Sequence, residues 1–190
     1  MAHGAGAPMD SDWMNDFTGR LVKKDIRVVR FEFPYMLERR LGGSKRPPNK
    51  AAILLETWRE VLVSQQKKSK AIFIGGKSMG GRMASLIADE ENVSGLIGLG
   101  FPFHAPGKEP KDRILHLEKL KTPTIMIQGT RDPLGNQEEC RSYKLSKKIS
   151  FTWLEDGDHS WKPRKKSGYN LEDHMDKAAD SIANFMYSNS

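Results

Sequence analysis

Short apolar runs alternate with longer amphipathic stretches along most of this chain, and this alternation constrains the fold more than any other feature of the sequence. Short runs with little polar content are typical of buried strands, whereas apolar residues spaced three and four apart are typical of helices that cover them. The expected strands are residues 26–31, 71–74, 94–99, 124–128 and 149–154. The pattern predicts an α/β fold with a mostly parallel sheet and helices on both of its faces.

Helices are expected between these strands. The first is expected to begin near Ser11, which can cap a helix N-terminus, and to bury Trp13, Phe17 and Leu21. Residues 33–49 contain three prolines and two glycines, so we expect a loop there. The remaining helices are expected from about Asn49, around Met83 to Ile87, and over residues 113–120, 137–146 and 171–187.

Length and composition indicate one globular domain over residues 1–190. The chain has 37% hydrophobic and 29% charged residues, which argues against disorder, a coiled coil or a collagen-like fibre. No run approaches the roughly 18 apolar residues of a membrane span, and the N-terminus has no secretory pattern. The single cysteine, Cys140, cannot form an internal disulfide, as expected in a reducing compartment. We therefore expect a cytoplasmic protein without a membrane partner.

The formal net charge of +7 raises the question of nucleic-acid binding. The basic residues gather at 67–70, 144–148 and 162–166, three places spread along the chain without interleaved aromatic residues or a nucleic-acid-binding motif. This distribution favours a solvated basic surface over a nucleic-acid interface.

The segment Gly76-Lys77-Ser78-Met79-Gly80 matches G-x-S-x-G and lies between an expected strand and an expected helix. That context is the one a nucleophile elbow requires, with the serine hydroxyl exposed at a sharp turn and glycines where side chains do not fit. A phosphate-binding loop would need glycine at position 71, where the chain has Ala71. We therefore interpret Ser78 as a nucleophile.

A serine nucleophile needs a base and an acid. His159 follows the strand expected to end near 154, whereas His3, His116 and His174 lie in other motifs or helices. Asp132 follows the strand over 124–128 and completes the chain order Ser, Asp, His that is typical of one large class of hydrolases, although Asp156 and Asp158 remain competitors. All these residues come just after the carboxyl ends of expected parallel strands, where open α/β sheets place their ligand sites.

The glycine-rich turn His3-Gly4-Ala5-Gly6-Ala7-Pro8 is suited to presenting a main-chain donor to a developing oxyanion. We expect the amide of Ala5 to act with the amide of Met79. The alternative for this turn is a flexible N-terminus.

Six segments together resemble the α/β-hydrolase superfamily, and more closely its small dienelactone-hydrolase-like branch. They are HGAGAP at 3–8, RFEFPY at 30–35, GGKSMGGRMAS at 75–85, GFPFHAPGK at 100–108, QGTRDP at 128–133 and EDGDHSWKP at 155–163. They look like compact bacterial hydrolases related to a testis-expressed animal protein and to the hydrolase-like domain of a chromatin-complex subunit. The resemblance implies Ser78 as nucleophile, Asp132 as acid and His159 as base.

The chain departs from this family before the H-G turn, where the family has a central strand and about two strands before it. Only Met1 and Ala2 precede His3, whereas strands usually need about five residues. We therefore expect either a chain that starts late or a central strand that is nearly absent, so that the sheet lacks its N-terminal strands.

These observations predict a serine hydrolase, a carboxylesterase or dienelactone-hydrolase-like enzyme without cofactor or metal, that cleaves a small-molecule acyl substrate through an acyl-enzyme. The rival hypothesis is a catalytically silent hydrolase-like binding or scaffold protein. Four residues follow expected strand ends and are candidates to line the substrate pocket, although such residues are about as often simple packing: Tyr35, Phe103, His104 and Trp161.

Overall fold

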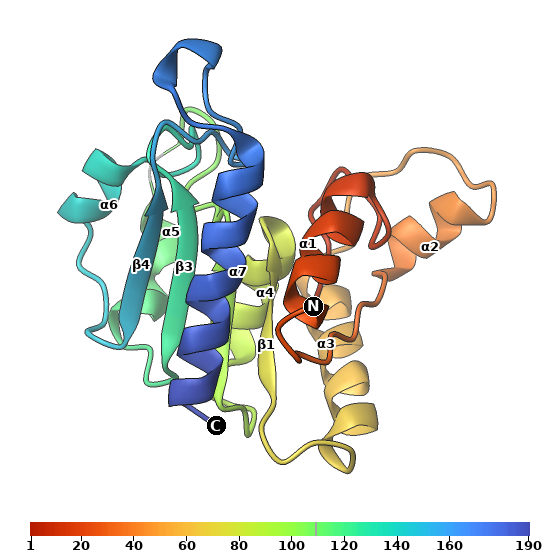
Figure 1. Cartoon of the computed structure of the whole chain (residues 1–190). Coiled ribbons are helices and arrows are strands. Elements are labelled where there is room, and N and C mark those ends of the chain that lie inside the picture. The colour runs from red at the N-terminus through yellow and green to blue at the C-terminus, as the bar shows by residue number, and fades with distance from the viewer. Residues whose placement is uncertain (109) are drawn as a thin grey trace.

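The computed structural model describes residues 1–108 and 110–190, with the side chains of residues 111 and 112 outside that description. Within these residues four parallel strands form one sheet in the order β1-β2-β3-β4 (Figure 1). Because the strands are parallel, their carboxyl ends meet at one edge of the sheet. Their bounds are Phe73–Lys77 for β1, Gly95–Leu99 for β2, Thr124–Gly129 for β3 and Ile149–Leu154 for β4.

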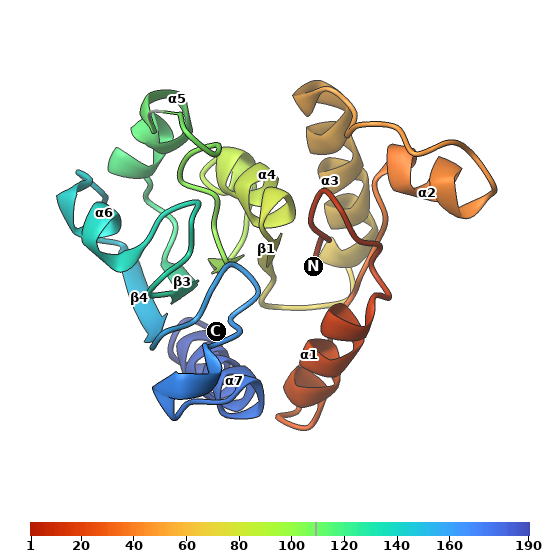
Figure 2. The same ribbon diagram turned by 90° about the horizontal axis from the view of Figure 1, so that it is seen from above.

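Helices cover both faces of this sheet, as expected (Figure 2). On one face α1 (Asp12–Val22) and α7 (Leu171–Ser188) bury a cluster that includes Phe17 and Ile182. On the other face a second cluster includes Trp58 and Met83. The helices of that face are α3 (Ala51–Gln66), α4 (Met79–Ile87), α5 (Lys111–Ile114) with the 3₁₀ turn Leu115–Glu118, and α6 (Gln137–Ser142). None of the helices in residues 1–108 and 110–190 combines the length and the apolar character needed to cross a bilayer.

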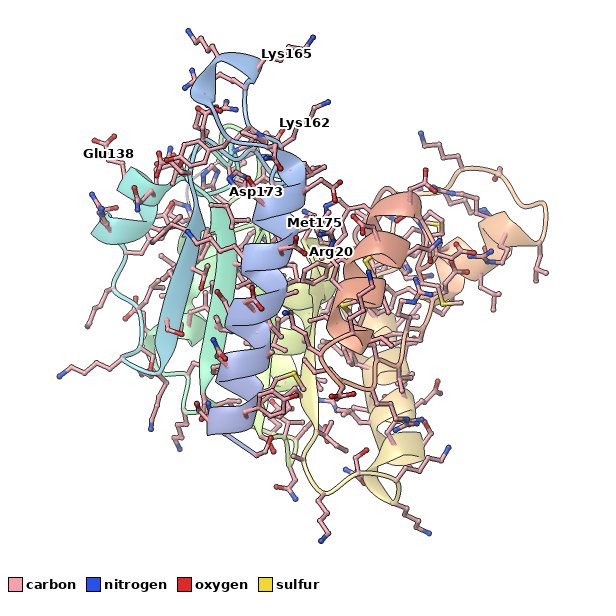
Figure 3. The ribbon with its side chains drawn as sticks, in the orientation of Figure 1. Arg20, Glu138, Lys162, Lys165, Asp173 and Met175 are labelled. Carbon is pink, nitrogen blue, oxygen red and sulfur yellow. The ribbon has the colours of Figure 1, made fainter. Side chains whose placement is uncertain are left out.

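An ion-pair cluster joins α1 to α7 on the first face. Arg20, which points from α1 toward α7 in Figure 3, binds Asp16 on its own helix and both Glu172 and Asp176 on α7. Lys162 and Lys165 extend into solvent from the loop between β4 and α7, the second of them in the 3₁₀ turn Lys165–Ser167 (Figure 3). These lysines fit the solvated basic surface that the sequence favours.

The strand expected over residues 26–31 does not form. Phe31 makes only an isolated parallel bridge to Ala2, and Ala2 makes a second bridge to Gly76 of β1. The amide of Ala2 donates to the carbonyl of Gly75 at 2.9 Å, and the amide of Lys77 donates to the carbonyl of Ala2 at 3.0 Å. The prediction is wrong because an apolar, β-branched run becomes a strand only when a neighbouring strand pairs with it. The place expected for the central strand is occupied by Ala2, which bridges Phe31 and β1.

A cavity of about 140 Å³ lies between residues 26–29 and β1. Its walls are mainly apolar and include Leu62, Ile72 and Ile74. The N-terminal ammonium group of Met1 donates to the carbonyl of Val29 at 2.6 Å, and burial lowers its pKa to about 5. The amino group of Met1 is therefore enclosed, although the residue as a whole is only half-buried.

The loop expected over residues 33–49 contains a helix, α2 (Pro34–Arg40). The proline does not break this helix because it occupies the first helical position, where an amide hydrogen would have no partner. Met36 is buried, and the two glycines at 42 and 43 follow the helix rather than interrupt it. The prediction is wrong because the positions of the prolines and glycines matter more than their number.

Candidate active site

Ser78 lies at the turn between β1 and α4, at the carboxyl edge of the sheet. Its backbone has φ 50° and ψ −115°, a conformation that non-glycine residues rarely adopt. It also occupies the N-cap of α4, so the free main-chain amides and the positive end of the helix dipole lie beside it. The sharp turn expected at the G-x-S-x-G segment is therefore present.

The two glycines of this segment are required by more than the turn. A Cβ on Gly76 would lie 2.2 Å from the carbonyl oxygen of Ala2. A Cβ on Gly80 would lie 2.6 Å from the carbonyl oxygen of His3 and 2.7 Å from that of Ala2. The glycines let the N-terminal residues cross directly over the start of α4.

Replacing Gly80 with alanine is expected to destabilise the fold by about 2–3 kcal/mol, because main-chain oxygens have to move to admit the Cβ. Alanine would otherwise stabilise a helix relative to glycine. Gly19 in α1 is the matched control, since a Cβ there meets nothing within 4 Å, and Gly19→Ala is expected to stabilise by about 0.5–1 kcal/mol. Urea unfolding of both variants measures these changes, and stabilisation by both would contradict the packing argument.

Ser78, His159 and Asp132 are joined by hydrogen bonds, although they come from three separate turns. Ser78 Oγ lies 3.0 Å from His159 Nε2, and His159 Nδ1 lies 2.8 Å from Asp132 Oδ2. Because a carboxylate only accepts, Nδ1 carries the proton and Nε2 is free to accept from the hydroxyl. Asp132 has no accessible surface, whereas the His159 side chain is 27% exposed. Solvent or a small molecule can therefore reach the ring but not the carboxylate.

Gln128 fixes the carboxylate from behind, a role that the sequence did not suggest. Its side-chain amide donates at 3.0 Å to Asp132 Oδ2, while Asp132 Oδ1 accepts from the amide of Leu134 at 2.9 Å. The same side chain also bonds both main-chain groups of Phe101 and the carbonyl of Gly135. Gln128 is fully buried at the end of β3, so the polar residue in an otherwise apolar run was the available signal.

The competing carboxylates lie elsewhere in the loop that carries His159. Hydrogen bonds from Arg164, together with the charge of Arg131, hold the pKa of Asp156 well below its usual range despite the opposing effect of burial. Asp158 Oδ1 accepts from the amides of Ser160 and Lys162 at 2.8 and 3.0 Å. Both carboxylates shape the loop, and the bond to His159 comes from Asp132.

The glycine-rich N-terminal turn packs against Ser78. A Cβ on Gly4 would lie 3.7 Å from Ser78 Cβ. Within residues 1–108 and 110–190, the amides of Ala5 and Met79 donate to no protein acceptor. Two unpaired donors therefore lie on the two chain segments that border the serine.

Side chains hold this turn in place. His3 Nδ1 donates to the carbonyl of Gly4 at 2.7 Å, and His3 Nε2 accepts from the amide of Phe33 at 3.1 Å. The Tyr35 hydroxyl donates to the carbonyl of Ala5 at 2.9 Å, and burial raises the pKa of Tyr35 to about 12. This bonding speaks against a flexible N-terminus.

The residues expected to line a pocket mostly serve packing. Phe103 and Trp161 have no accessible surface, and Tyr35 has almost none. His104 is buried with Nε2 3.4 Å from a carboxylate oxygen of Glu139. In this conformation Phe103 and Trp161 offer no surface to a ligand, because strand ends at this edge also supply the cores on either face of the sheet.

Comparison with known proteins places the chain in a family. A sequence profile of the alpha/beta hydrolase domain matches residues 1–187. Similar solved structures include an alpha-beta serine hydrolase homologue from Coxiella burnetii, with a TM-score of 0.69 and 16% identity over 96% of this chain and 82% of that one. Est1E from Butyrivibrio proteoclasticus has a TM-score of 0.67 and 14% identity over 99% and 86%. A monoacylglycerol lipase from Paleococcus ferrophilus has a TM-score of 0.72 and 14% identity over 100% and 93%. These identities are low enough that the structures show a shared fold alone, whereas the profile spans almost every residue, and the protein therefore belongs to the alpha/beta hydrolase family.

Proposed function

We propose that this alpha/beta hydrolase is a serine hydrolase that cleaves ester-like bonds of small acyl substrates through an acyl-enzyme. One observation carries the proposal: Ser78 Oγ, His159 and Asp132 form a continuous hydrogen-bonded chain with distances of 3.0 and 2.8 Å. A hydroxyl, a neutral imidazole and a buried carboxylate in that order can activate the hydroxyl as a nucleophile.

In the proposed first step Ser78 Oγ attacks the substrate carbonyl while His159 Nε2 takes the hydroxyl proton. The carbonyl oxygen becomes an oxyanion, which the amides of Ala5 and Met79 stabilise because neither has an acceptor among the described residues. Asp132 stabilises the imidazolium that forms. His159 then gives the proton to the departing alcohol, and the acyl group remains on Ser78.

In the second step water attacks the acyl-enzyme. His159 takes a proton from the water, and the collapse of the second tetrahedral intermediate releases the acid and returns the proton to Ser78 Oγ. These two steps use the side chains of Ser78, His159 and Asp132, the main-chain amides of Ala5 and Met79, and a water molecule.

The names of similar proteins support an ester substrate. One of the similar structures is Est1E with ferulic acid bound, another is the esterase domain of a Rhodothermus marinus protein, and a third is a monoacylglycerol lipase. The His159 side chain is 27% exposed, so a small substrate can reach the ring. We therefore propose small esters of the carboxylesterase or dienelactone-hydrolase kind as the substrate class.

A fluorophosphonate probe tests the proposal, because it reacts with activated serines and with few others. We expect the folded protein to take up one equivalent of probe on the peptide that contains Ser78 and to hydrolyse p-nitrophenyl acetate. Ser160→Ala is the matched control, since Ser160 is an exposed serine beside His159 and its loss is expected to leave labelling unchanged. Folded protein that is neither labelled nor active would support the catalytically silent scaffold instead.

A further inference from the structure

Lys77 links the candidate nucleophile to the candidate base. It is the last residue of β1 and directly precedes Ser78. Its Nζ donates to the main-chain carbonyl of His159 at 2.7 Å. One residue therefore connects the strand that carries the hydroxyl to the loop that carries the imidazole.

A glycine and an aromatic ring surround Lys77 Nζ. Gly100, in the turn after β2, has φ 59°, and a Cβ there would lie 2.8 Å from Nζ and 2.9 Å from the His159 carbonyl oxygen. The ring of Trp13 on α1 lies 5.7 Å from Nζ, within the range of a cation–π contact. Four parts of the fold thus meet around a single ammonium group: the end of β1, the segments after β2 and β4, and helix α1.

The ammonium group of Lys77 is enclosed without forming an ion pair. Within the described residues no carboxylate lies within 4 Å of Nζ, and the charged groups that face it are Asp132 and Asp158. Burial lowers the pKa of Lys77 to about 8, against the opposing attraction of these two carboxylates. A methionine or leucine would fill the same space without losing hydration. Packing alone therefore does not explain a lysine here.

We propose that Lys77 is a positioning residue that sets the place of the His159 ring relative to Ser78 Oγ. The proposal rests on the serine-hydrolase function given above. The bond to the His159 carbonyl fixes the main chain from which the imidazole extends, and displacing a catalytic group by about 1 Å can cost on the order of 10² in rate.

Lys77→Met tests this role, because it keeps most of the stem and removes the donor and the charge. With p-nitrophenyl acetate we expect kcat to fall by about 10–100-fold while KM changes less than threefold. Lys77→Arg keeps a cationic donor and is expected to recover part of the loss. Lys177→Met is the matched control, since Lys177 also donates to a main-chain carbonyl, that of Trp153 at 2.8 Å, but on the exposed face of α7. That control is expected to have wild-type kinetics.

Rescue by Lys77→Arg separates positioning from space filling. Lys77→Arg returns a cationic donor to the His159 carbonyl, whereas Lys77→Met fills the space without one. A side chain that only filled space would give the two variants the same kcat. An active wild type with an unaffected Lys77→Met would overturn the role of Lys77, whereas a wild type without labelling or hydrolysis would overturn the proposed function itself.

Thermal unfolding gives a second readout that needs no activity. At pH 7 the Tm of Lys77→Met is expected to equal or exceed that of the wild type, because a poorly hydrated charge is removed. Between pH 8 and 10.5 the unfolded wild type keeps a proton on Lys77 that the folded protein has lost, so wild-type stability rises relative to the variant. The difference in Tm should therefore shrink over this range. A difference in Tm that does not change over this range would mean that the Lys77 ammonium is not enclosed in the folded protein, and would contradict the proposal.

Discussion

Ser78→Ala is expected to lower kcat for p-nitrophenyl acetate by about 10⁵–10⁶-fold, the largest effect of any single substitution in this protein. The variant loses the only atom that forms the acyl-enzyme, while the oxyanion donors remain and retain a small residual rate. The fold should be unaffected, because within the described residues the only side-chain hydrogen bond of Ser78 is the one to His159. Active-site titration of the burst phase measures whether the acyl-enzyme still forms, and urea unfolding measures whether the stability of the fold has changed.

A double variant sharpens this prediction. If Ser78 and His159 act as one unit, Ser78→Ala combined with His159→Ala should be no slower than Ser78→Ala alone, because either change disables the same step. Multiplying losses would mean that the two side chains act independently. If Ser78→Ala retained more than a tenth of wild-type activity, Ser78 would be excluded as the nucleophile.

Asp132→Asn is expected to lower kcat by about 10⁴-fold with little change in KM. All three recorded partners of the carboxylate are donors: His159 Nδ1, the side-chain amide of Gln128 and the main-chain amide of Leu134. An asparagine has only one acceptor oxygen, so its NH₂ group has to face at least one of these donors. If the asparagine oxygen stays bonded to the amide of Leu134, the NH₂ group faces His159. His159 Nδ1 can accept from that group only if the ring proton moves to Nε2, and a protonated Nε2 can no longer accept from Ser78 Oγ.

The control for this variant is Asp158→Asn. Asp158 belongs to the same loop as His159 but binds main-chain amides rather than the ring. Its replacement is expected to leave kcat within about tenfold of the wild type. Steady-state kinetics on both variants decide the assignment. A larger loss of kcat in Asp158→Asn than in Asp132→Asn would mean that Asp158, after β4, is the acid rather than Asp132, after β3.

The parts of the fold that local sequence determines were predictable. The strand over 149–154 and the turn at Ser78 depend on apolar runs and glycines that lie within a few residues of each other. The strand expected over 26–31 failed because pairing is a property of two segments, and the segment beside it is reduced to Ala2. Helix α2 was missed because proline counts were weighed without regard to position.

The candidate site likewise contains residues that the sequence predicts and residues that it does not. Ser78, Asp132 and His159 could be named in advance because each follows a strand whose end is set by sequence pattern, and parallel strands bring their ends together. Gln128 and Tyr35 act through hydrogen bonds to distant main-chain groups, and no spacing in the chain encodes those partners. The burial of Phe103 and Trp161 likewise depends on the helices that close over them.

The position of Ala2 determines how activity is expected to be lost when the protein begins to unfold. It is the residue that bridges the segment ending at Phe31 to β1, and it stands one residue before the turn that carries the oxyanion donor Ala5. Within the described residues both bridges of Ala2 are isolated, so no neighbouring ladder hydrogen bonds reinforce them. Breaking the two hydrogen bonds between Ala2 and β1 would let the donor turn, together with the His3 and Tyr35 contacts that hold it, move away from Ser78 while β2, β3 and β4 stay paired. Loss of activity would then precede melting of the sheet, and chemistry rather than ellipticity would report the first step of unfolding.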